Sequence, residues 1–276
     1  GGRRGVGGGT KGGAGAAPVN PALVRRAAWE RLGLTRRTLR AAIAEEDYAR
    51  AAALRDERAA ALDELPPRLQ FCQAQLDVLL DEGAPAAERA GAAEGLGRVG
   101  DADLVAPELS ALLARCGGRA DGGGAQAELV SAIENSLWAI WLRAPEHHSE
   151  AHVIDEAMVR GMRHMQTPVE LPLAVEVFSD VIAQAPSFAE AVNKRATALY
   201  LLGELERSVA DCRTVLNLNP HHFGALSGLG MCFLRLGRPH EAKSAFEEAL
   251  RVNPTMNAIS DYVVALEEQL KASDAQ

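Results

Sequence analysis

Apolar residues recur at the spacing of an α-helix in several long segments of the chain. Ile133, Leu137 and Ile140 form one such stripe within residues 127–143, and residues 257–271 carry another. Alanine and leucine supply most of the apolar content, and runs of β-branched residues are scarce. Because alanine and leucine favour helices, the pattern predicts an all-α protein. No run of about 18 apolar residues occurs, so we expect no membrane insertion.

The C-terminal half of the chain repeats itself every 34 residues. Pro186, Pro220 and Pro254 lie 34 residues apart, and so do Gly203 and Gly237. This period resembles that of tetratricopeptide repeats, pairs of helices that stack into a right-handed solenoid. The predicted tetratricopeptide region is residues 151–276, with repeats at 155–188, 189–222 and 223–256 and a capping helix at 257–271.

Residues 223–230, FGALSGLG, hold three glycines directly after His221 and His222. A phosphate-binding loop would need a Gly-Lys-Ser/Thr sequence or a preceding strand, and neither is present. In the resemblance to tetratricopeptide repeats, Gly230 falls where the two helices of a repeat approach closely. We therefore expect these glycines to serve helix packing. Adjacent histidines point apart on most backbones, so joint metal binding by this pair is not expected.

Residues 39–62, LRAAIAEEDYARAAALRDERAAAL, resemble the UVR motif, a helical hairpin named for the bacterial UvrB and UvrC repair proteins. Its turn falls at residues 46–48, and we predict the hairpin domain over residues 30–66. The apolar positions of the motif are Leu39, Ile43, Tyr48, Ala52, Leu54 and Leu62. So short a hairpin cannot bury its apolar stripe alone. It is expected to pack either on its own chain or on a partner protein, since the family mediates protein contacts.

Residues 85–116 read as two helices around a turn at Gly100 and Asp101, and this stretch resembles a HEAT repeat. We predict a HEAT-like region over residues 67–150, with a generic helical bundle as the alternative. Trp138 and Trp141 lie three residues apart in its last helix. They are expected to fill the core between this region and the repeats, and a partner anchor is the alternative.

The first 29 residues contain five basic residues and no acid, and they are rich in glycine. Such a stretch cannot pack a core, so residues 1–29 are predicted to be a disordered tail. A basic, acid-poor leader is also typical of organelle transit peptides. The combination of UVR hairpin, HEAT-like middle and tetratricopeptide end resembles chloroplast proteins of plants and algae. We therefore expect a location in the chloroplast stroma, with the cytoplasm as the alternative.

The chain shows no catalytic motif and no cofactor-binding motif. Its net charge of −8 argues against nucleic-acid binding. His148, His152 and Glu156 share helical spacing and could ligate a metal, although solvated linker charges are the default expectation. The four cysteines form no C-x-x-C pair and read as buried thiols. A metal- or redox-dependent regulatory factor is therefore the alternative function.

The resemblance to tetratricopeptide repeats implies a concave groove lined by the first helix of each repeat. Its members in this chain would be Asn193, Thr197, Tyr200, Ser227, Met231 and Arg235. We expect Asn193 to grip a ligand backbone and Met231 to adapt to apolar side chains. Chaperone-binding relatives clamp a terminal carboxylate with Lys, Asn and Arg, and the residues here predict no such clamp. The expected function is a non-enzymatic scaffold or adaptor that binds a peptide or helix of other proteins, with plastid protein quality control or assembly as the expected setting.

Overall fold

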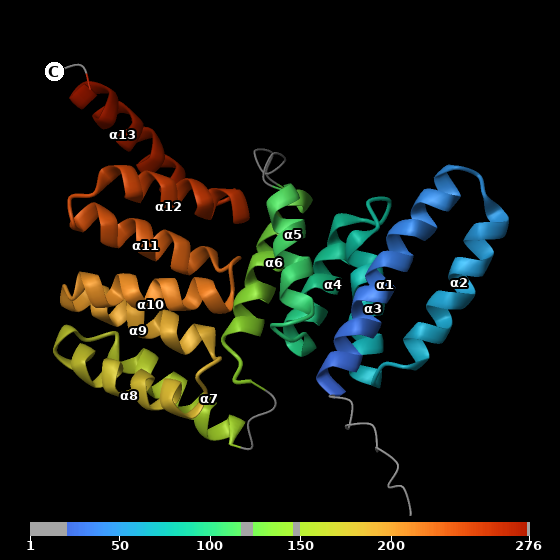
Figure 1. Cartoon of the computed structure of the whole chain (residues 1–276), viewed down its shortest axis with the longest axis horizontal. Coiled ribbons are helices and arrows are strands. Elements are labelled where there is room, and N and C mark those ends of the chain that lie inside the picture. Colours follow the sequence, from blue (N-terminus) through green and yellow to red (C-terminus); the bar gives the residue numbers. More distant parts are fainter. Residues whose placement is uncertain (1–20, 117–123, 146–149, 275–276) are drawn as a thin grey trace, which may run out of the picture. The chain divides into compact units, whose positions relative to one another are not determined.

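The structure, a computed structural model, describes residues 21–116, 124–145 and 150–274 (Figure 1). The elements within these residues are thirteen α-helices and one 3-10 turn, and the described residues contain no strand. The all-α prediction is confirmed. By internal contacts the chain divides into two units, residues 1–70 and residues 71–276.

A helical hairpin forms most of the first unit. Helix α1 (Pro21–Ala44) packs against α2 (Tyr48–Asp63), and the turn between them lies at residues 45–47. Glu46 adopts a left-handed φ of 59°, and the Asp47 side chain caps α2 by accepting the N–H of Arg50 at 3.0 Å. The predicted hairpin segment is therefore two helices around the predicted turn, and its assignment as a UVR motif stays a prediction.

Some large apolar residues of this hairpin lie outside, although Trp29 and Leu32 of α1 are buried. Ile43 and Tyr48 are 44% and 69% exposed, whereas Ala42, Ala51 and Ala61 are buried. Alanine adds little side-chain volume, so two helices that meet through alanines leave their larger residues on the outer surface. The apolar stripe expected from the UVR resemblance is thus not the buried face of the hairpin.

The prediction of a disordered tail over residues 1–29 is wrong for its last part. Helix α1 begins at Pro21, and Ala28 and Trp29 are buried. The glycines of the tail all precede residue 16, and residues 21–29 are mostly strong helix formers. The prediction used the average composition of residues 1–29, which concealed the change from glycine-rich sequence to helix-forming residues. Residues 1–20 lie outside the described residues.

Four helices lie between the hairpin and the repeats in sequence: α3 (Pro67–Leu80), α4 (Ala86–Val99), α5 (Val105–Cys116) and α6 (Ala125–Trp141). Both α4 and α5 pack on α6. Gly97 gives α4 a close approach to α6, because a β-carbon there would lie 2.9 Å from Ser136 Cα. Arg143 donates to the carbonyls of Gly100 and Gly97, which closes the C-terminal end of α4. The HEAT-like assignment of this bundle stays a prediction.

Six helices and a short turn build the repeats, and each helix packs on the next. They are α7 (Ala151–His164), η1 (Pro168–Glu170), α8 (Leu171–Gln184), α9 (Ala189–Leu202), α10 (Leu205–Leu218), α11 (Phe223–Arg235) and α12 (Pro239–Val252). Helix α13 (Asn257–Asp274) covers α12 through buried Ile259 and Leu266. Figure 1 shows these helices stacked in layers, with α6 running along one side of the stack, beside the helix ends.

The 34-residue period has a physical basis in two recurring features. Gly203 caps the C-terminal end of α9 with a φ of +83°, and Gly237 follows α11 with a φ of +70°. Glycine adopts this left-handed conformation without strain. Gly230 lies against the ring of Phe246, as predicted for the close helix approach, and Gly161 lies against Phe178 in the same way. Phe178 and Phe246 lie 68 residues apart, which is two periods, whereas Gly161 and Gly230 lie 69 apart, so the first helix of the first repeat departs from the period by one residue.

Candidate functional site

The first helices of the repeats form a shared surface. Helix α9 contacts α11 directly, although α10 lies between them in sequence. In a curved stack of helix pairs, the helices that meet across repeats line the inner side. The glycine contacts place Gly161, Ala196 and Gly230 at one register in α7, α9 and α11. Residues at the same offset from these three positions therefore lie in rows across the groove.

Three rows reach the surface of this groove, which we define as the open groove. The first row lies one residue after the register position and consists of Met162, Thr197 and Met231. The second row lies four residues after it and consists of Met165, Tyr200 and Leu234. The third row lies five residues after it and consists of Gln166, Leu201 and Arg235. All nine side chains are exposed or half-buried. The rows are mostly apolar, and three of the chain's five methionines belong to them. Of the predicted groove positions, Tyr200 and Arg235 are in contact, and Thr197 and Met231 lie on the same two helices, α9 and α11.

The methionines of α7 were missed from the sequence. The two prolines in the turn of the first repeat obscured where its first helix lies. Met158, Met162 and Met165 recur at i, i+4 and i+7, which is the spacing of one helix face and the signal that could have found them. Met158 is buried beneath the groove, and the other two reach its surface. The groove is therefore softer and more apolar than the mixed polar surface predicted.

Arg235 is held at one edge of the open groove by Tyr200. Its guanidinium carbon lies 4.8 Å from the centre of the tyrosine ring, and its Nη1 donates to the Tyr200 carbonyl oxygen at 2.7 Å. The side chain therefore spans from α11 to the C-terminal end of α9, where a cation is favoured by the helix dipole. An exposed arginine fixed in this way presents its remaining N–H donors from a defined place.

The predicted ligand-gripping role of Asn193 is not supported by its geometry. Asn193 is only 7% exposed, and its amide donates to the Glu190 carboxylate at 3.1 Å. Its backbone carbonyl accepts the Thr197 hydroxyl at 3.0 Å. The third polar residue predicted for the groove is Ser227, and its hydroxyl donates a hydrogen bond to the Gly224 carbonyl oxygen at 3.1 Å. These polar groups are used within the chain, so the groove offers few hydrogen bonds to a ligand.

Glu190 is the centre of a buried polar cluster beside the open groove. It is 1% exposed, and it accepts from His222 Nε2 at 2.8 Å and from Lys194 Nζ at 3.0 Å. His222 Nδ1 accepts the N–H of Ala225 at 3.1 Å, so the imidazole proton lies on Nε2. Burial acts to raise the pKa of Glu190, but the hydrogen bond from His222 and the charge of Lys194 outweigh it, and the pKa lies below its ordinary value.

Two tryptophans of α6 seal this cluster. The ring of Trp141 stacks on His222 with 4.5 Å between ring centres, and Trp138 meets Phe223 edge-on at 5.2 Å. Lys194 lies 5.6 Å over the ring of Trp138. The tryptophans therefore fill the core between α6 and the repeats, as predicted. They close the groove on the side of Asn193 and leave the three outer rows open.

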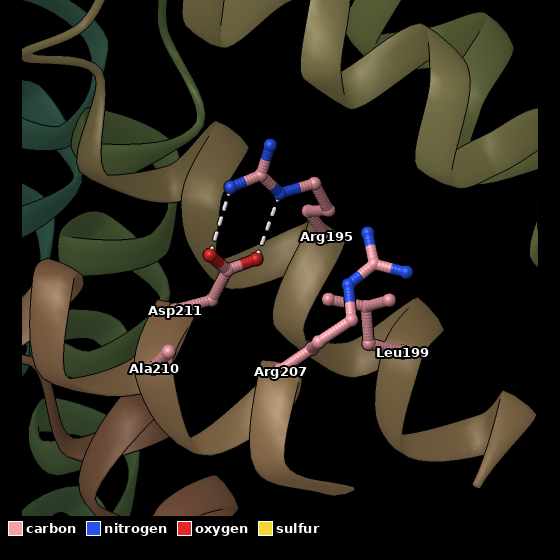
Figure 2. Close-up of a pocket in the computed structure, with 5 residues that line it drawn as sticks. All are labelled: Arg195, Leu199, Arg207, Ala210 and Asp211. Atoms are coloured by element: carbon pink, nitrogen blue, oxygen red, sulfur yellow. Dashed lines mark hydrogen bonds and ion pairs between the residues drawn. The ribbon is translucent and has the colours of Figure 1, made fainter. Parts of the chain in front are cut away.

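A separate pocket of about 230 Å³ lies on another side of the second repeat (Figure 2). Figure 2 shows Arg195 paired through two parallel bonds with Asp211, at 2.7 and 2.8 Å, and Arg207 beside them. Arg195 Nη1 also lies 3.2 Å from the Ser179 hydroxyl, so this side chain links α8, α9 and α10. Both charges of the pair are matched within the chain. We assign the pair to packing between repeats.

The predicted metal alternative finds no support in the described residues. His152 and Glu156 are exposed on α7, and His148 lies outside the described residues. No group of three or more metal-ligating side chains occurs in residues 21–116, 124–145 and 150–274. His221 is exposed while His222 is buried, so the two histidines do not act together. Within the same described ranges, no helix is long and apolar enough to cross a membrane.

Comparison with known proteins agrees with the repeats seen in the structure. Residues 223–256 and 170–222 match two models of the tetratricopeptide repeat. A TPR repeat-containing protein of Rhizobium etli is 34% identical over 99 residues, which are 36% of this chain and 48% of that protein. A small glutamine-rich tetratricopeptide repeat-containing protein of Mycosarcoma maydis is 26% identical over 37% of this chain and 29% of its own length. The chain thus spans less than half the length of these relatives.

Solved tetratricopeptide domains resemble part of the chain. The Sgt2 TPR domain from Aspergillus fumigatus matches with a TM-score of 0.43 and 17% identity, covering 49% of this chain and 86% of the domain. The first TPR of Spaghetti (RPAP3), bound to an HSP90 peptide, matches with a TM-score of 0.43 and 18% identity, covering 45% and 98%. The assignment of tetratricopeptide repeats to residues 170–256 rests on the two family models.

Proposed function

We propose that the chain is a non-enzymatic scaffold that binds an amphipathic segment of another protein in the open groove. One observation carries this proposal: α9 and α11 meet directly, Tyr200, Met231 and Leu234 on these helices are half-buried, and Arg235 is fixed on Tyr200. Unbranched methionine side chains adapt to varied apolar partners. A row of such residues across three parallel helices suits a ligand helix laid along it.

The positive charge of Arg235 makes one edge of this apolar surface different from the other and so favours one orientation of a ligand. A ligand with an acidic residue beside its apolar face could pair with the guanidinium while its apolar side chains cover Met162 and Met231. The desolvated apolar centre would supply most of the affinity, and the rim cation would mainly orient the ligand. Polar groups near the sealed side are already hydrogen-bonded within the chain, which supports a ligand recognised by side chains rather than by its backbone.

This proposal includes no clamp for a terminal carboxylate. Asn193, Thr197, Ser227 and Met231 stand where that clamp would be, and Asn193 is already held by Glu190. An internal segment of a partner is therefore the proposed ligand. A role in plastid protein quality control, and a docking role for the UVR-like hairpin, belong to the same proposal and rest on the sequence resemblances alone.

Peptide binding by the full chain tests the proposal. The probes are fluorescein-labelled synthetic helices of roughly four turns, with leucine or phenylalanine on one face and glutamate at its edge. Three controls accompany them: a sequence-scrambled peptide, a peptide with lysine in place of glutamate, and a peptide with an amidated C-terminus. We expect micromolar binding, with the amidated peptide unchanged and the lysine peptide weaker.

Two groove variants and one matched variant locate the site. Met231→Glu and Arg235→Glu are each expected to weaken binding about tenfold or more, because both alter the centre or edge of the contact. Arg213→Glu makes the same charge change at an exposed position on the second helix α10 and is expected to leave binding unchanged. Equal losses in all three variants, or binding that none of them affects, would show that the open groove is not the site.

A further inference from the structure

Two cysteines face each other between the second and third repeats. Cys212 lies on α10 and Cys232 on α11, and these helices pack together. The two residues are 2% and 0% exposed. The pair is separate from the open groove, although Cys232 follows Met231 directly in α11.

Neighbouring contacts give the same placement independently. The S–H of Cys232 donates to Ser208 Oγ at 3.2 Å, and Ser208 lies one turn before Cys212 on α10. A β-carbon at Gly228 would lie 3.6 Å from Cys212 Sγ, and Gly228 lies one turn before Cys232 on α11. Residues four apart share one helix face. The faces of α10 and α11 that carry the cysteines are thus turned toward each other.

The repeat register explains why there is room for two sulfurs here. Cys212 occupies the position that Phe178 and Phe246 occupy in the first and third repeats. In those repeats a phenylalanine ring fills the space beside a glycine of the first helix. A cysteine is much smaller than phenylalanine, and Cys232 lies on the next helix, α11, which packs against α10. The substitution thus replaces an aromatic contact by a pair of thiols.

The surroundings of Cys232 favour its reactive form. The hydrogen bond that Cys212 donates lowers the pKa of Cys232 to about 7, with a further contribution from the Arg235 cation and against the effect of burial. The same hydrogen bond and burial raise the pKa of Cys212. Since the thiolate is the nucleophile of cysteine chemistry, Cys232 is the attacking sulfur and Cys212 the resolving one.

We propose that Cys212 and Cys232 are a peroxide-reactive dithiol that closes to a reversible disulfide between the second and third repeats. The Cys232 thiolate attacks one oxygen of hydrogen peroxide, the O–O bond breaks, and the leaving hydroxide takes up the proton that Cys232 had released. This forms Cys232 sulfenic acid and water. The Cys212 sulfur then attacks Cys232 Sγ, the S–O bond breaks, and the hydroxyl leaves as a second water with the Cys212 proton. Two thiols are oxidised, and one peroxide is reduced to two waters.

Peptide mapping of the native full chain tests this proposal. The reduced protein is treated with hydrogen peroxide, unfolded, alkylated with iodoacetamide and digested with trypsin. The four cysteines fall on separate tryptic peptides, with Cys212 in 208–213 and Cys232 in 214–235. We expect these two peptides joined by a disulfide that dithiothreitol reverses, while Cys72 and Cys116 are alkylated. The rate of closure is expected to rise as the pH is raised through about 7 and then to level off.

Controls distinguish a disulfide formed by the folded arrangement of Cys212 and Cys232 from unselective oxidation of the four cysteines. Protein unfolded before oxidation should give mixed pairings, and a Cys72→Ser variant should close the Cys212–Cys232 bond as the wild type does. In Cys212→Ala, Cys232 should stop at the sulfenic acid, which dimedone traps. The proposal is overturned if both cysteines of the native protein are alkylated after peroxide, if either pairs with Cys72 or Cys116, or if Cys232 passes directly to sulfinic acid.

Discussion

Replacing His222 by alanine removes three interactions of the sealed cluster at once. The imidazole donates to the buried Glu190 carboxylate, caps α11 by accepting the N–H of Ala225, and stacks on Trp141. A hydrogen bond to a charged group contributes about 1.5–3 kcal/mol, an N-cap about 1 kcal/mol, and a stacked ring pair about 0.5–1.5 kcal/mol. We expect His222→Ala to lower the free energy of unfolding by about 3–5 kcal/mol, because each group is fully buried.

A second variant separates the cap from the rest. Asparagine is a good N-cap residue, so His222→Asn should retain the bond to the Ala225 N–H while losing the contacts with Glu190 and Trp141. Its cost should therefore be about 1 kcal/mol smaller than that of His222→Ala. His221→Ala is the matched control, since that neighbouring histidine is exposed. It should change stability by less than about 0.5 kcal/mol.

Urea unfolding followed by tryptophan fluorescence measures these differences. A Trp29→Phe background leaves Trp138 and Trp141, which both contact the His222 ring, as the reporters. A cost for His222→Ala within about 1 kcal/mol of that for His221→Ala would refute the reasoning. The cluster would then be a geometric coincidence of packing and not a source of stability.

Two further predictions follow from buried positions. The pKa of Glu190 is lower in the folded chain than its ordinary 4.5, so its contribution to stability is present above pH 4.5 and is lost as the pH falls below it; urea midpoints measured at descending pH should fall more steeply for the wild type than for Glu190→Gln. Gly230→Ala should destabilise by about 1–3 kcal/mol, because its methyl group would overlap the Phe246 ring. On the same helix Gly228→Ala meets only an ordinary contact with Cys212 and should stabilise by up to about 1 kcal/mol through helix propensity; thermal melts of the two variants that shift in the same direction would contradict this assignment.

Features with a local cause were predictable from the sequence. Pro220 and Pro254 end helices, and Gly203 and Gly237 adopt φ values that favour glycine, so the 34-residue period records backbone requirements directly. The close approach at Gly230 was likewise predictable, since the family pattern places a large side chain opposite.

Features set by distant contacts were not predictable in this way. Asn193 stands at a groove position of the family and lies one turn after Glu190 on α9, but both are buried beside His222, which stacks on Trp141 of α6. No local pattern encodes that burial, because His222 lies 32 residues after Glu190 and Trp141 lies some fifty residues before Asn193. The facing of Cys212 and Cys232 also depends on how α10 meets α11, and the period alone shows only that Cys212 replaces a phenylalanine.

The position of α6 along the side of the stack changes how the repeats can come apart. In a linear array each unit touches only its neighbours, so such arrays can fray from a terminus one unit at a time. Here Trp138 and Trp141 hold the start of α11, Lys194 of α9 lies over Trp138, and Glu134 approaches Thr255 beyond α12. One helix thereby bridges successive layers, and none of these layers can open without breaking its contact with α6. Hydrogen exchange should accordingly show α6, α9 and α11 opening together as one cooperative unit. Stepwise opening from a terminus, as in an array without such a helix, should be limited to helices outside this unit.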